Sequence, residues 1–319
     1  MNQFARNQIA MHQIPRRKFL KQSALTTASL SLMSALPRQL AAESLAKSPG
    51  IQLYTVGKEL TQDMSGTLAK ISAIGYRTVE SAGLAGKSSA DFRKALDAAG
   101  LKCPSSHLFL APGQTAEQYF DDVKTLGSEY AVSSVLIKPG AGIKSIDDYI
   151  KMVAAMTQDD FKKMAADLND LATKAKSAGL SFAYHNHNME FRKWPDGSTT
   201  YDILMAQTDP SLVKIELDCG WCDLGGHSPQ SIFEKYPGRV RMLHIKDFVA
   251  VPAPITTLDP RTDPETTELG KGHMDYRAIL AAAPAAGVEH IFVEQEPPYV
   301  KFTALEAAKV DFDYLRSIG

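Results

Sequence analysis

The 319-residue chain lacks several features that would place it in a specialised class of protein. It has only three cysteines, which are too few for a disulfide framework. It contains no run of about 18 apolar residues, so an ordinary membrane-spanning helix is not expected. Its composition, 44% hydrophobic and 22% charged, is typical of a folded globular protein and excludes a disordered or collagen-like chain. The length suits one large α/β domain or two smaller ones.

Acidic residues are absent from the first 42 positions, which hold six Lys and Arg side chains. The remaining 277 residues therefore carry 29 basic against 36 acidic side chains, a net charge of −7. Nucleic-acid binding draws most of its affinity from a basic surface. The charge balance thus disfavours a nucleic-acid partner.

The basic N-terminal segment has the order of an export signal. Arg16 and Arg17 precede a mildly apolar, Ser- and Thr-rich stretch that reaches small residues at Ala41 and Ala42. The paired arginines, followed by Phe19 and Leu20, resemble a twin-arginine (Tat) signal. We expect residues 1–42 to be a Tat-type signal peptide read by the Tat export machinery, and residues 43–319 to work in the periplasm or otherwise outside the cytoplasm. A free basic amphipathic helix is the alternative interpretation.

Short apolar runs alternate with longer amphipathic ones beyond Gly50. The expected strands are 51–54, 78–81, 102–107, 134–137, 181–185, 213–218, 240–244 and 290–294. The expected helices are 62–73, 90–98, 116–125, 161–177, 201–207, 229–236, 276–286 and 303–316. Eight strand–helix units in about 270 residues predict an α/β fold of the (β/α)8 TIM-barrel type. The competing doubly wound sheet needs a Gly-rich phosphate-binding turn after the first strand, and residues 54–58 do not form one.

Histidines and carboxylates end six of the eight expected strands. These residues are Glu80, His107, His185, His187, Glu216, Asp218, His244, Asp247, Glu294 and Glu296. Strand side chains alternate between faces, so His185 and His187 point the same way, as do Glu216 and Asp218. In a barrel such residues converge at the mouth. Facing imidazoles and carboxylates are ligands for one divalent ion: Mn²⁺, Co²⁺, Zn²⁺, Fe²⁺ or Mg²⁺, with Mn²⁺ favoured.

Three motifs resemble a known family. Residues 184–191, 216–221 and 243–247 are similar to strands five to seven of the sugar phosphate isomerase/epimerase superfamily, and shorter matches follow in order over residues 50–318. This superfamily is the xylose isomerase-like TIM barrel, also called the AP endonuclease 2 domain. The resemblance implies a metal-dependent sugar isomerase or epimerase, or a carbon–oxygen lyase.

The resemblance also implies a ligand set. The family holds one divalent ion with residues from strands five to eight, which correspond here to His185, Asp218, His244 and Glu294. At the first of these positions the family has a glutamate. The histidine at 185 is therefore a departure, and it disfavours simple two-base epimerisation. Whether His185 or His187 binds the ion stays open.

The expected chemistry is abstraction of a proton next to a carbonyl of a free sugar, keto-sugar or glycoside, leading to isomerisation, epimerisation, dehydration or β-elimination. A neutral imidazole suits the base, which makes His187 the first candidate. Further catalytic candidates are Glu294, Glu216 and Glu80, and Lys246 is expected to polarise a hydroxyl or carbonyl. The residues expected to contact the sugar are Tyr54, His107 and Trp221.

Two other functions fit parts of the sequence. A catalytically silent sugar-binding barrel would keep the same ligands, and an abasic-site endonuclease would share the fold. The Cys219 and Cys222 pair has redox-motif spacing, but a local disulfide or two free thiols lining the pocket fit its context better. The sequence leaves a homo-oligomer open.

Overall fold

A computed structural model describes residues 40–107, 114–134, 143–250, 252–257, 259, 264–299 and 301–319. Eight parallel strands close into a barrel in the order β1-β10-β7-β6-β5-β4-β3-β2. They are β1 Gly50–Gln52, β2 Thr78–Ala82, β3 Lys102–His107, β4 Tyr130–Ser133, β5 Ser181–His185, β6 Val213–Asp218, β7 Val240–Ile245 and β10 His290–Val293. The prediction of a (β/α)8 TIM barrel is confirmed.

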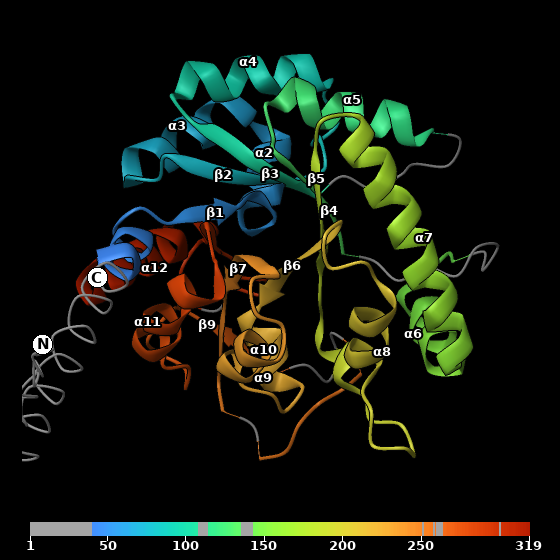
Figure 1. The fold of residues 1–319 in the computed structure, drawn as a ribbon. Helices are drawn as coiled ribbons and strands as arrows, with labels where there is room; N and C mark the ends of the chain where they lie inside the picture. The colour runs from blue at the N-terminus through green and yellow to red at the C-terminus, as the bar shows by residue number, and fades with distance from the viewer. Residues whose placement is uncertain are drawn as a thin grey trace, which may run out of the picture. The chain divides into compact units, whose positions relative to one another are not determined.

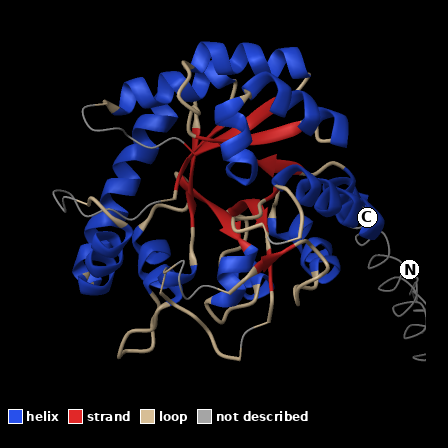
Figure 2. Cartoon of the chain, turned by 180° about the vertical axis from the view of Figure 1, so that it is seen from behind, coloured by secondary structure: helices blue, strands red, loops and turns tan. Residues whose placement is uncertain are grey.

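Helices connect the strands and surround the barrel within residues 42–319 (Figures 1 and 2). They are α2 Gly57–Gln62, α3 Met64–Ile74, α4 Ser89–Ala99, α5 Ala116–Leu126, α6 Ile146–Ala155, α7 Gln158–Ser177, α8 Thr200–Gln207, α9 Cys219–Leu224, α10 Pro229–Lys235, α11 Tyr276–Ala286 and α12 Ala304–Ile318. Two 3-10 turns, η1 Leu53–Val56 and η2 Asn188–Phe191, follow β1 and β5. A helix also covers residues 40–47.

Local chemistry fixes the helix ends. The Thr157 side chain accepts a hydrogen bond from the Asp160 backbone, and the Asp160 carboxylate accepts one from the Thr157 backbone, which starts α7 with a capping box. Gly100 ends α4 in the left-handed conformation (φ 67°), which glycine adopts without steric cost. Among the described residues, no helix has the length and apolarity needed to cross a membrane.

The barrel interior changes from apolar to polar along each strand. Its floor is a small cluster of buried apolar residues that includes Ala183, Met242 and Phe292. Two residues further along the same strands stand His185, His244 and Glu294. Because alternate residues share a face, these polar side chains lie above the apolar floor, towards the carboxyl ends of the strands. The other strand face packs against the helices in the main core.

Several elements differ from the expected ones. β4 occupies Tyr130–Ser133 rather than 134–137, directly after the left-handed cap at Gly127; residues 135–137 lie outside the described residues. β1 ends at Gln52, whose side chain caps the 3-10 turn by accepting from the Tyr54 backbone. Helices α2, α6 and α9 were not expected. The expected signal segment lies outside the described residues up to residue 39.

The loop after β7, expected as a long connection over residues 250–272, carries a two-stranded antiparallel sheet of β8 Asp247–Phe248 and β9 Thr266–Thr267. The Asp247 carboxylate organises this loop. It accepts hydrogen bonds from five backbone N–H groups, those of Phe248, Gly270, Gly272, His273 and Met274. The loop is therefore fixed at the carboxyl end of the barrel.

Candidate active site

Two tiers of polar side chains, most of them ionisable, stand at the carboxyl ends of the strands. The inner group consists of Gln52, Glu80, His107, His185, Glu216 and His244. The outer group consists of His187, Asp218, Trp221, Lys246, Glu294 and Glu296. Strand register explains the two tiers, because Asp218, Lys246 and Glu294 each come two residues after an inward-facing position of the same strand.

The inner group is centred on Glu216. Its Oε2 lies 2.5 Å from His107 Nε2, 3.1 Å from His185 Nδ1 and 3.4 Å from His244 Nε2. Three imidazole nitrogens thus face one carboxylate oxygen. Glu80 is adjacent: its Oε2 accepts from Gln52 Nε2 at 2.8 Å and lies 2.5 Å from His244 Nε2.

The outer group meets the inner one at His244. Its Nδ1 lies 3.0 Å from Glu294 Oε2 and 3.8 Å from Asp218 Oδ2. Ligand atoms of Asp218, His244 and Glu294 all fall within 4.8 Å of one another, and those of His107, His185, Glu216 and His244 do so as well. Three of the four predicted metal ligands therefore lie together, while His185 joins the inner group.

Neighbouring groups hold these side chains in place. Asp218 is the N-cap of α9, and its Oδ1 accepts from the Trp221 backbone at 2.8 Å. The Asn186 amide exchanges two hydrogen bonds with the Asp218 backbone, at 3.1 and 3.3 Å. Glu190 accepts from the His187 backbone at 3.0 Å and from the Tyr184 hydroxyl at 2.6 Å. Each contact fixes a segment that follows a strand of the barrel.

Burial and mutual charge shift the pKa values within the cluster. Burial alone would raise the pKa of Glu80, but the imidazoles of His107 and His244 outweigh it and lower that pKa to about 2. Burial and then the charge of Glu80 raise the pKa of Glu216 to about 7. Burial lowers the pKa of His244, yet Glu216, Glu294 and Glu80 raise it overall well above its usual value. Protons thus offset the excess negative charge.

The pKa values of His185 and His187 are lowered instead. Burial, followed by repulsion from His244 and His107, lowers the pKa of His185 well below its usual value. Burial and the charge of Lys246 lower the pKa of His187 to about 3. Both imidazoles are therefore neutral near pH 7, the form in which imidazole binds a metal or accepts a proton.

Several buried polar atoms of the cluster have no hydrogen-bond partner within the described chain. They are Glu80 Oε1, Glu216 Oε1, Asp218 Oδ2 and His187 Nδ1. Unpaired buried polar atoms are costly, so such atoms gathered at one place point to a bound group. Carboxylate oxygens and imidazole nitrogens are the donors that divalent ions take. The residues present therefore fit a divalent metal.

The predicted substrate contacts are placed differently from one another. Trp221 is buried, with Lys246 Nζ 4.5 Å from its ring centroid. Tyr54 is 51% exposed beside the outer group, where burial and the charge of Glu296 raise its pKa. His107 faces Glu216 in the inner group and is 7% exposed.

Sequence reasoning placed Glu296 at the barrel mouth without a role of its own and did not single out Gln52. Glu296 follows Glu294 by two residues, and this alternation is a signal that both point the same way. Gln52 offers no such signal, since its role comes from the pairing of Gln52 with Glu80 across β1 and β2.

The Cys219 and Cys222 thiols are free and buried on α9, inside the main core. Burial, followed by nearby carboxylates, raises the pKa of each thiol well above its usual value. A thiol that resists ionisation is a poor redox nucleophile. Of the three interpretations, two free thiols agree with the structure, although they pack in the core rather than line the site.

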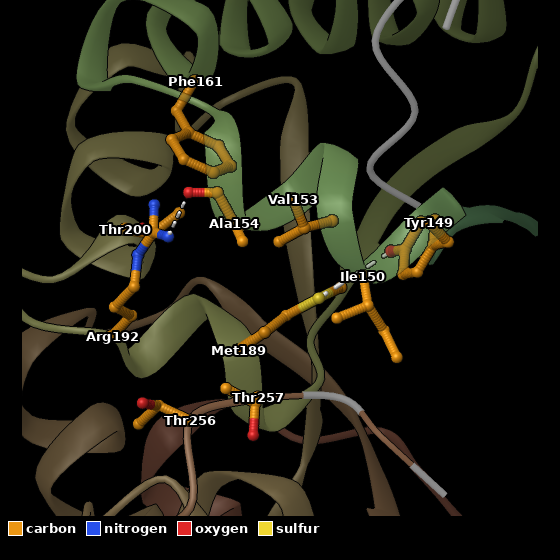
Figure 3. A pocket seen from close by; sticks show the side chains of 10 residues that line it. All are labelled: Tyr149, Ile150, Val153, Ala154, Phe161, Met189, Arg192, Thr200, Thr256 and Thr257. Atoms are coloured by element: carbon orange, nitrogen blue, oxygen red, sulfur yellow. Dashed lines mark hydrogen bonds between the residues drawn. The ribbon is translucent and has the colours of Figure 1, made fainter. Parts of the chain in front are cut away.

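A small apolar pocket of about 60 Å³ lies beside η2, the turn that follows His187 (Figure 3). It is lined by Tyr149, Ile150, Val153, Ala154, Phe161, Met189, Arg192, Thr200, Thr256 and Thr257. Figure 3 shows Tyr149 donating to the Met189 sulfur and Arg192 to the Ala154 carbonyl. The pocket shares no residue with the inner or outer group.

A closed parallel barrel with imidazoles and carboxylates at the carboxyl ends of its strands is the architecture of TIM-barrel enzymes. The chain belongs to the family described as the Xylose isomerase-like TIM barrel, whose model matches residues 68–318.

Relatives with curated names agree with this class. The inosose dehydratase of Lacticaseibacillus casei is 25% identical over 279 residues, covering 82% of this chain and 90% of that protein. A solved sugar phosphate isomerase/epimerase from Parabacteroides distasonis is 25% identical with a TM-score of 0.66, covering 84% of this chain and 97% of that one. The IOLI protein with a binding zinc atom shares the fold at 20% identity and a TM-score of 0.58, covering 85% of this chain and 97% of that one. The named relatives support an enzyme of the broad isomerase, epimerase and lyase class.

Proposed function

We propose that this protein is a divalent-metal-dependent carbon–oxygen lyase that acts on a keto-sugar or a keto-glycoside. It removes a proton next to the carbonyl and expels a β-oxygen as water or as an alcohol. The observation that carries the proposal is that Asp218, His244 and Glu294 are buried with their ligand atoms close together, above the imidazole-rich inner group. The likeness to inosose dehydratases favours elimination over isomerisation, as does the histidine at position 185.

Asp218, His244 and Glu294 would hold the metal, with His185 or His187 as a further ligand. A divalent ion bound there supplies Lewis-acid stabilisation of the enediolate that forms when the proton leaves. Asp218 Oδ2, which has an ion pair with Lys246 but no hydrogen bond, and His244 Nδ1 are the donors that fit such an ion. Mn²⁺ is the favoured metal.

The base is His187. Its Nδ1 has no partner among the described residues, and its imidazole is neutral, so this nitrogen has a lone pair free for a substrate proton. Glu190 fixes the backbone of His187, which keeps the imidazole at the mouth of the barrel. Lys246 donates towards the oxygen that leaves, and the face of the Trp221 ring holds its ammonium at 4.5 Å from the ring centroid.

The test combines metal removal with a substrate panel. Purified protein treated with a chelator should lose turnover of 3-keto-glycosides and inososes, and Mn²⁺ or Co²⁺ should restore it. In D2O, loss of water or alcohol should accompany exchange of the proton next to the carbonyl. Interconversion of ordinary ketoses without elimination would show that the protein is an isomerase or epimerase and not a lyase. Sugar binding with no exchange at any carbon would make the protein a silent binder.

We also propose that residues 1–42 direct Tat export to the periplasm or another extracytoplasmic space. Support comes from Arg16 and Arg17 with the apolar, small-residue stretch after them. Replacing both arginines by lysine should keep the protein in the cytoplasm, while Lys21→Arg should leave export unchanged. Equal export of both variants would refute the assignment.

A further inference from the structure

Lys246 is a lysine with no exposed surface, and three carboxylates surround its ammonium group. Its Nζ lies 3.0 Å from Glu294 Oε2 and 3.3 Å from Asp218 Oδ2, and it also contacts Glu296 Oε1. The fourth side is the face of Trp221, at 4.5 Å. Burying an ammonium is costly unless such partners compensate for its lost hydration.

These partners fall into two classes. Asp218 Oδ2 and Glu294 Oε2 are oxygens of the group that, with His244 Nδ1, would hold the metal. Glu296 and the Trp221 ring stand outside that group. The ammonium and a metal ion would therefore compete for the first pair, whereas the second pair remains available to the ammonium in either state.

We propose that Lys246 is the counter-cation of the metal-free site. We further propose that Glu296 and the Trp221 ring continue to bind its ammonium when a metal is bound by Asp218 and Glu294. This inference rests on the proposed metal-dependent function. In the metal-free protein the ammonium neutralises the ligand carboxylates, which would otherwise repel one another in a buried site. On metal binding it shifts its contacts towards Glu296.

The proposal assigns Glu296 a positioning role. Glu296 binds no metal itself; it lowers the cost of displacing Lys246 from the ligand oxygens. It also keeps the ammonium next to the metal, where a substrate oxygen would arrive. The Glu296 side chain is 26% exposed, consistent with a residue at the mouth of the site.

The experiment is a double-mutant cycle on Mn²⁺ affinity, measured by calorimetry on the full-length protein. Lys246→Met removes the competing cation and should tighten Mn²⁺ binding about tenfold, because two like charges no longer share the same oxygens. Glu296→Gln should weaken binding about tenfold, since the ammonium loses its alternative carboxylate. In the Lys246→Met background, Glu296→Gln should change the affinity by less than about twofold.

The control variant is Lys271→Met, which removes an exposed lysine from the loop after β7 and should leave the affinity unchanged. A second readout is the thermal midpoint without metal, which Lys246→Met should lower and saturating Mn²⁺ should restore. If Lys246→Met fails to fold, Lys246→Arg is used: with its cation retained, it should bind Mn²⁺ like the parent, and Glu296→Gln should weaken binding in that background.

Additive effects of the two substitutions would overturn the proposal, because Glu296 would then act on the metal directly and not through Lys246. Unchanged or weaker binding by Lys246→Met would also overturn it. A parent protein that binds no divalent ion at all would instead refute the proposed function. The two failures are thus separate observations.

Discussion

Asp311 on α12 is a buried carboxyl group whose ionisation should reduce stability. It is 1% exposed, and its Oδ1 accepts from the Leu269 backbone at 2.7 Å. Burial, aided by the charges of Glu268 and Asp247 and opposed by the Leu269 hydrogen bond, raises its pKa from 3.8 to about 8. The folded state therefore keeps a proton that the unfolded chain releases above pH 3.8.

The sign and size of the effect follow. Between pH 4 and 8 this group makes the free energy of unfolding fall as pH rises, by up to about 1.4 kcal/mol per pH unit. Asp311→Asn keeps the acceptor for Leu269 but cannot ionise, so it removes this slope. Relative to the parent, the variant should gain up to about 3 kcal/mol of stability between pH 5 and pH 7.

The assay is urea unfolding of both proteins at several pH values from 5 to 8. The matched control is Asp313→Asn on the same helix, where the side chain is 59% exposed and paired with Lys309. That variant should run parallel to the parent across the pH range. Parallel curves for Asp311→Asn as well would refute the reasoning, because the folded protein would then hold no extra proton at this position.

Three further outcomes are expected. His187→Asn should slow substrate proton exchange by about 10²–10⁴-fold, with Mn²⁺ affinity within a few-fold of the parent; a large loss of affinity would make His187 a ligand instead. Asp218→Asn should weaken Mn²⁺ binding at least tenfold, because changes to residues that only support metal ligands already cost about that much. Asn can still cap α9, so the free energy of unfolding of the metal-free protein in urea should stay near that of the parent. Gly272→Ala should cost about 1–3 kcal/mol in urea unfolding, because its Cβ would lie 2.1 Å from Asp247 Oδ1, whereas Gly57→Ala, with open space around it, should not.

The sequence predicts strands well where an apolar run is long and bounded. β5 and β6 match their predicted ranges because each apolar run leads directly into polar residues at the barrel mouth; β3 also matches its predicted range, although it has no such run. β4 was predicted too far towards the C-terminus, since a four-residue strand gives a weak periodic signal. β1 was predicted too long because its end depends on the Gln52 side chain capping η1, a contact that local propensity does not encode.

The candidate site, like the strands, could be predicted from the sequence only in part. Asp218, His244 and Glu294 end adjacent strands, so their meeting follows from the barrel itself. The division into two tiers was not predictable, because it depends on register between strands. His185 pairs with Glu216, whereas Asp218 pairs with His244, and this offset separates His185 from the outer group.

His244 connects the two tiers, and its surroundings bear on the histidine at position 185. Its Nε2 faces Glu80 and its Nδ1 faces Glu294 and Asp218; a metal bound on the Nδ1 side would replace the Nδ1 proton, and the proton on Nε2 would stay with Glu80. The inner carboxylates thus orient a ligand of the outer group. Glu80 and Glu216 already place two buried carboxylates beneath the site, and a third at position 185 would add repulsion between like charges. A neutral imidazole there adds a donor nitrogen without adding charge, which agrees with the proposal that His187, and not a second glutamate, is the base.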